Sequence, residues 1–90
     1  MMNESEMLKI LKYNLQKLSS ADDEYLKKLI VQAIALMSRE GIVDDGTDDY
    51  DMAVIDYAAF LFRKRAKTEK VMPRLLRIEL NNLLFSQKSK

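Results

Sequence analysis

Apolar residues recur at intervals of three and four along four stretches of the chain, with charged residues between them. This spacing places the apolar side chains on one face of an α-helix. The first predicted helix runs from about Glu4 to Leu18, and the second starts after Ser20 or Asp22 and stops before Gly41. Their apolar positions are Met7, Leu8, Leu11, Leu15 and Leu18 in the first, and Leu26, Leu29, Ile30, Ala33, Ile34 and Met37 in the second.

Polar residues that favour helix ends flank these two stretches. Asn3 or Ser5 is suited to cap the first helix, and Ser20 or Asp22 is suited to cap the second, because their side-chain oxygens accept bonds from unpaired backbone N–H groups. Gly41 is suited to end the second helix, since glycine readily adopts the left-handed conformation that terminates many helices.

The third stretch is the most apolar part of the chain. Between Met52 and Phe62 the only residue that is neither apolar nor aromatic is Asp56. A helix that is apolar on nearly every side is normally covered on several sides, so it is expected to lie at the centre of the fold. The preceding loop is rich in aspartate, and Asp48 or Asp49 is suited to cap this helix.

The fourth stretch begins near Pro73, a residue that suits the first turn of a helix. One stripe consists of Leu76, Leu80, Leu83 and Leu84, and a second consists of Leu75, Ile78 and Phe85. Residues 86–90 read as a frayed tail. With no useful β-alternation and no internal repeat, the chain is predicted to be one all-α domain over residues 1–90, a compact bundle of about four helices.

Composition narrows the class of protein. The chain has 90 residues, of which 48% are hydrophobic and 32% are charged, and no apolar run approaches the roughly 20 residues of a membrane span. The acidic N-terminal segment is unlike a secretory signal, and the lack of cysteine fits the cytosol. A chain of this length buries only about 60 to 65% of its unfolded surface, so added contacts from association are expected to matter.

The absent residue types argue against an enzyme or a metal protein. Without histidine or cysteine, the usual imidazole base, thiolate nucleophile and zinc ligands are missing. The two glycines, Gly41 and Gly46, form no glycine-rich phosphate loop. The sequence therefore predicts no catalytic residues, no cofactor and no metal.

Two acidic features of the sequence are candidate sites. The aspartates around Gly46 fail the calcium-loop pattern, which requires ligands at fixed positions on both sides of its glycine, so a solvated loop with helix capping is favoured. Asp56 is expected to reach water or a partner, because an unpaired buried carboxylate is costly. It has no second carboxylate at helical spacing, so it makes a poor acid–base pair.

Charge is segregated along the chain. Residues 1–40 are balanced, residues 41–60 carry a net charge of −6, and residues 61–90 carry +7. Oppositely charged surfaces on one small protein favour head-to-tail association, although the same segments could also pair within one chain. The hypothesised subunit interface consists of Asp44, Asp45, Asp48 and Asp49 on the acidic side and Arg63, Lys64, Arg65 and Lys67 on the basic side.

The basic segment also suggests a nucleic-acid-binding regulator. Its cations are Arg63, Lys64, Arg65, Lys67, Lys70, Arg74 and Arg77. No aromatic residue is interleaved with them to stack on bases, and the whole chain has a net charge of only +1. A solvated or partner-facing basic end is therefore favoured, and a small helical regulator that uses residues 63–77 is the alternative.

Several stretches together resemble a known family. They are DDEYLKKLIVQAIALM, an acidic loop, AVIDYAAFLFRKR and MPRLLRIELNNLL. This succession resembles the small head-tail connector proteins of tailed bacteriophages and prophages, also described as DNA-packaging, adaptor or head-completion proteins. The likeness covers about residues 5–85, with residues 58–61 matching the central helix and residues 72–84 matching the C-terminal helix.

The resemblance implies a structural role without catalysis. Such proteins form a ring under the portal, extend the DNA channel without sequence-specific binding, and provide an attachment surface for tail or completion proteins. It implies assembly in the bacterial cytoplasm, a final position at the head-tail junction, no membrane partner, and a free form that could be monomeric. The hypothesised portal contacts are Leu80, Leu83, Leu84 and Phe85.

Overall fold

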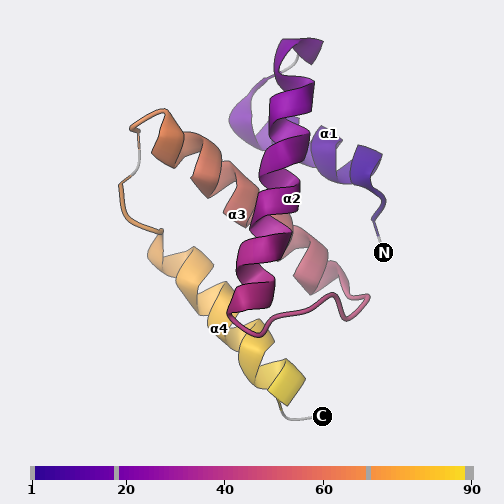
Figure 1. Ribbon diagram of the computed structural model, residues 1–90, viewed down its shortest axis with the longest axis vertical. Helices are drawn as coiled ribbons and strands as arrows, with labels where there is room; N and C mark the ends of the chain where they lie inside the picture. The colour runs from indigo at the N-terminus through magenta and orange to yellow at the C-terminus, as the bar shows by residue number, and fades with distance from the viewer. Residues whose placement is uncertain (1, 18, 69, 89–90) are drawn as a thin grey trace.

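The computed structural model describes residues 2–17, 19–68 and 70–88, and the described chain is all-α (Figure 1). Its helices are α1 (Glu4–Leu15), α2 (Asp23–Arg39), α3 (Asp48–Arg65) and α4 (Arg74–Lys88), with a short 3₁₀ turn, η1 (Ser20–Asp22), before α2. No strand occurs among these residues. The prediction of an all-α bundle of about four helices is confirmed.

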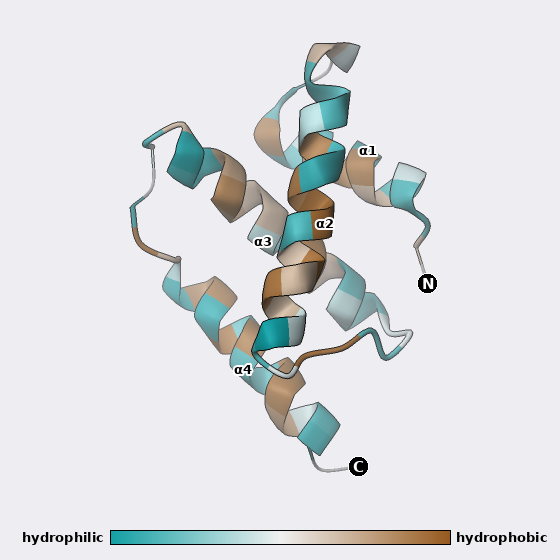
Figure 2. Ribbon diagram, in the orientation of Figure 1, coloured by the Kyte–Doolittle hydropathy of each residue, from teal (hydrophilic) through white to brown (hydrophobic). Residues whose placement is uncertain are grey.

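Helix α3 is the centre of this bundle. It packs against α1, α2 and α4, and α2 crosses its middle (Figure 1). Residues on every side of α3 are buried, including Ala53, Val54, Ile55, Ala58 and Leu61. The other helices each bury a narrower apolar stripe, which is visible as recurring brown segments along α2 and α4 in Figure 2. The expected central position of the third helix is confirmed.

The first helix is shorter than predicted. Asn3 caps α1 by accepting a 2.8 Å bond from the Glu6 N–H, but the helix ends at Leu15 because Gln16 adopts a left-handed conformation. The N–H of Lys17 then donates to the carbonyl of Lys12 and closes the helix end. The predicted end at Leu18 lies outside the described residues.

Helix α2 has an unexpected start and the expected end. Ser19 caps η1, whereas Ser20 lies inside that turn, and Asp22 precedes α2 without a capping bond from its side chain. At the other end, Gly41 is left-handed, with φ of 92°. The Ile42 N–H donates to the Met37 carbonyl, so the predicted stop at Gly41 is confirmed.

The ends of α3 and α4 also differ from expectation. Thr47 caps α3 through a 3.1 Å bond from the Tyr50 N–H, so Asp48 and Asp49 lie in the first turn and do not cap it. Pro73 immediately precedes α4. Helix α4 continues to Lys88, so residues 86–88 are helical and do not form the expected frayed tail. Residues 89–90 lie outside the described chain.

Two hydrogen bonds from the Gln87 side chain hold the end of α4 to the α2–α3 loop. Its amide nitrogen donates to the Val43 carbonyl over 2.6 Å, and its amide oxygen accepts from the Val43 N–H over 2.9 Å. The side-chain amide of Gln87 thus satisfies both the backbone N–H and the backbone carbonyl of Val43 in the α2–α3 loop. Sequence spacing gave no sign of this contact, because the two residues are far apart in the chain.

Substitution of a small central residue tests the packing of α3. Ala58 is fully buried, so Ala58→Leu should overpack the contact and lower the free energy of unfolding by about 1 to 3 kcal/mol. The matched control is Ala35→Leu on the exposed face of α2, which should change stability by less than about 0.5 kcal/mol. Denaturant unfolding measures both, and equal midpoints for the two variants would contradict the central position of Ala58.

Candidate functional site

The two charged segments lie at opposite ends of α3. The acidic end consists of Asp44, Asp45, Asp48 and Asp49, and the basic end consists of Arg63, Lys64, Arg65 and Lys67. Lys64 follows Asp49 by fifteen positions in the helix, which is about 22 Å at a rise of 1.5 Å per residue. Salt bridges between Asp48 or Asp49 and Lys64 or Arg65 within one chain are therefore out of reach, because α3 holds its two ends apart.

Local hydrogen bonds build the acidic end. Asp44 accepts from the Gly46 N–H over 2.9 Å, and Asp45 accepts from the N–H of Thr47 over 3.0 Å and from its hydroxyl. Asp48 and Asp49 are exposed in the first turn of α3, where negative charge complements the helix dipole. Within the described ranges, no group of three or more acidic side chains is arranged to hold a metal ion.

At the basic end, two arginines form hydrogen bonds to neighbouring helices and two lysines are exposed to solvent. Arg63 donates to Asn14 of α1 over 2.9 Å, and Arg65 donates to Gln32 of α2 over 3.2 Å. Lys64 and Lys67 are exposed. Lys67 adopts a left-handed conformation with φ of 64°, and this turn ends α3.

The remaining cations differ in exposure and pairing. Lys70 and Arg74 are exposed, as are Lys64 and Lys67. Arg77 instead forms a salt bridge with Glu40 at the end of α2. The cluster that the nucleic-acid hypothesis requires thus loses Arg77 to a contact within the chain.

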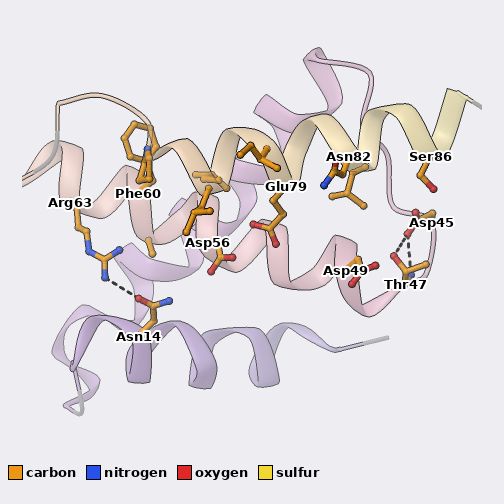
Figure 3. A pocket seen from close by; sticks show the side chains of 16 residues that line it. Asn14, Asp45, Thr47, Asp49, Asp56, Phe60, Arg63, Glu79, Asn82 and Ser86 are labelled. Atoms are coloured by element: carbon orange, nitrogen blue, oxygen red, sulfur yellow. Dashed lines mark hydrogen bonds between the residues drawn. The ribbon is translucent and has the colours of Figure 1, made fainter.

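A groove of about 800 Å³ runs between α3 and α4 (Figure 3). Charged and polar side chains line it from the acidic end to the basic end, namely Asp45, Thr47, Asp49, Asp56, Arg63, Glu79, Asn82 and Ser86, together with Asn14 of α1. Its apolar lining consists of Ala59, Phe60, Pro73, Leu75, Leu76, Ile78 and Leu83. Four of these residues are acidic and one is basic, so the groove is negatively charged.

Asp56 and Glu79 form a carboxyl pair inside this groove. Their side chains approach one another from α3 and α4 (Figure 3), and a hydrogen bond joins them. Burial, then this bond and the charges of Asp56 and Asp49, raise the pKa of Glu79 from 4.5 to about 7. Asp56 therefore has a second carboxylate, although none stands at helical spacing on its own helix.

Sequence reasoning missed Glu79 because the partner of Asp56 comes from another helix. One signal was present: Glu79 is three residues after Leu76 and four before Leu83, so it borders the stripe that faces the core. A carboxylate at the border of this stripe must lie beside the surface on which the fourth helix packs. The identity of that surface depends on how α4 packs on α3.

The hypothesised portal contacts divide into buried and exposed residues. Leu80 and Leu83 lie in the core, with exposed fractions of 0% and 7%, so they present no surface to a partner. Leu84 is half-buried, and Phe85 is 70% exposed. The exposed apolar residues of α4 are Leu75, Ile78 and Phe85, which belong to the second stripe.

A second buried carboxylate also escaped sequence reasoning. Asp51 in the first turn of α3 is fully buried, and its Oδ2 accepts a 2.8 Å bond from the backbone N–H of Met2. Its Oδ1 has no hydrogen-bond partner among the described residues. Because its Oδ2 holds the Met2 backbone, we interpret Asp51 as an anchor for the N-terminal segment.

None of the described helices has the length and hydropathy required to cross a lipid bilayer. Comparisons of the chain with protein-family models, with curated proteins and with solved structures found no match.

The raised pKa of Glu79 makes stability depend on pH. Between pH 4.5 and about 7 the folded protein holds this proton and the unfolded chain does not, so stability should fall as pH rises through that window. We expect a loss of about 1 to 2 kcal/mol, because solvent screens the half-buried carboxyl. Glu79→Gln should remove this component, as measured by denaturant unfolding at pH 5 and pH 8. An identical pH dependence in wild type and Glu79→Gln would contradict the raised pKa.

Proposed function

We propose that this protein is a non-enzymatic structural subunit of a phage head-tail connector ring. The observation that carries the proposal is the exposure of opposite charges at the two ends of one central helix. The resemblance of the sequence to small connector proteins supports the same role. In this role the ring docks under the portal, extends the DNA channel and provides the attachment surface for tail or completion proteins.

The physical basis of assembly is head-to-tail pairing. The acidic end of one subunit faces the basic end of the next, and such contacts between unlike surfaces close into a ring when the rotation permits. Each exposed pair contributes about 0 to 1 kcal/mol, so the charges select orientation and register. Most of the affinity must come from apolar contact. Leu75, Ile78 and Phe85 supply exposed apolar surface for the neighbouring subunit and the portal.

The role places the protein in the bacterial cytoplasm during assembly and at the head-tail junction afterwards. It needs no catalytic residue, cofactor or metal. The portal-facing residues are revised by the exposure of α4, with Leu75 and Ile78 joining Phe85 in place of the buried Leu80 and Leu83. DNA in the channel would meet basic side chains without sequence-specific contact.

Charge reversal at the two ends tests the proposed assembly. Asp48→Lys with Asp49→Lys, or Lys64→Glu with Arg65→Glu, should weaken association about tenfold or more, since two attractions become repulsions. Combining all four substitutions should restore it. Light scattering of the protein alone and with portal protein measures the mass, and circular dichroism controls for helicity. Assembly of both half-reversed variants at wild-type strength would contradict head-to-tail pairing.

The competing function is a nucleic-acid-binding regulator, favoured by the exposure of Lys64, Lys67, Lys70 and Arg74. It requires tight duplex binding by the isolated protein, with affinity that falls steeply as salt rises. The variant with all four charges reversed separates the two functions. A connector would regain assembly in this variant, whereas a regulator would lose DNA affinity and its salt dependence.

A further inference from the structure

The groove between α3 and α4 has two unlike walls. Its acidic lining includes Asp49, Asp56 and Glu79 (Figure 3), and its apolar lining includes Leu75 and Ile78. Leu75 is 80% exposed and Ile78 is 43% exposed, although both lie on a helix that packs on the core. A hollow of about 800 Å³ with such walls is large enough for several side chains of a partner.

The chemistry of these walls favours a basic segment that also carries an apolar side chain. Asp56 and Glu79 are held close together in the groove, where burial first, and then the hydrogen bond to Asp56 and the charge of Asp56, raise the pKa of Glu79. A lysine or arginine placed between two carboxylates relieves their repulsion and forms charge-assisted hydrogen bonds. The exposed Leu75 and Ile78 would cover an apolar residue beside that cation.

A segment with this composition is present in the chain itself. Lys64, Lys67 and Lys70 are exposed, and Val71 beside them is 81% exposed. None of these four side chains is among the residues that line the groove of their own chain. The segment 64–71, of which all but residue 69 is described, contains four cations, namely the three lysines and Arg65, and one acid, Glu69. It thus offers net positive charge and the exposed Val71 to another molecule.

We propose that the α3–α4 groove is the docking site for segment 64–71 of a second copy of this chain. Lysine side chains of the second copy bind the Asp56–Glu79 pair, and its Val71 packs on Leu75 and Ile78. The inference rests on the proposed ring function and names the surface through which neighbouring subunits join. On this inference, the main partner of the basic segment is the groove and not the exposed aspartates at the start of α3.

Neutral isosteric substitution tests the groove without disturbing the fold. Asp56→Asn with Glu79→Gln removes the negative pair at constant volume and should weaken self-association about tenfold, with the helical content unchanged. Lys64→Gln with Lys67→Gln should weaken it by a similar factor. The combined variant should be little weaker than either pair alone, because both changes remove the same contact. The matched control is Glu24→Gln, an exposed acid on α2, which should leave the association constant unchanged.

Concentration-dependent light scattering, alone and with portal protein, gives the association constants. If wild type assembles and Asp56→Asn with Glu79→Gln assembles equally well, the groove is not the docking site, while the ring function stands. Additive losses from the groove and segment variants, or an equal loss in Glu24→Gln, would also overturn the docking of segment 64–71. If wild type does not assemble under either condition, the proposed function fails and the inference fails with it.

Discussion

Burial of the apolar middle of α3 is the constraint on which the rest of the structure depends. Three helices pack around residues such as Ile55 and Ala58, and this packing leaves no place for charge except at the two helix ends and along the α4 side. Helix rigidity then keeps the acidic and basic ends about 22 Å apart. Exposed charges such as Asp48, Asp49 and Lys64 therefore cannot pair with one another along the helix within one chain, which connects the packing of the core to the proposed assembly.

The carboxyl pair shows a second consequence of the same packing. Helix α4 brings Glu79 against Asp56 although neither residue has the other in its sequence neighbourhood. Ionisation of both carboxylates in a half-buried groove is unfavourable, because the two negative charges repel. Either one carboxylate keeps its proton near pH 7, or a cation binds between them. In the isolated chain the proton held by Glu79 limits this repulsion. Binding of a basic partner would remove a cost that the fold itself creates.

Sequence periodicity predicted the elements of this fold better than their contacts. The four helices, the stop at Gly41 and the central position of α3 followed from local spacing, because each depends on residues a few positions apart. The Asp56–Glu79 pair and the Gln87–Val43 bonds join distant segments, and spacing within one helix does not encode them. The burial of Leu80 and Leu83 shows the same limit, since two apolar stripes on α4 were visible but the packing decided which one faced inward.

Cysteine cross-linking tests head-to-tail assembly most directly, because the chain contains no cysteine of its own. Ser86 lines the groove beside Asp45 and Thr47, whereas Ala66 is exposed at the basic end, and replacing both preserves every charge. A disulfide forms only where the Cα atoms approach within about 7 Å. Under mild oxidation on assembled protein, the chain with both Ser86→Cys and Ala66→Cys should give a ladder of covalent oligomers, and each single variant should stay monomeric. Dimers from a single variant, or no ladder from the double variant, would contradict the account.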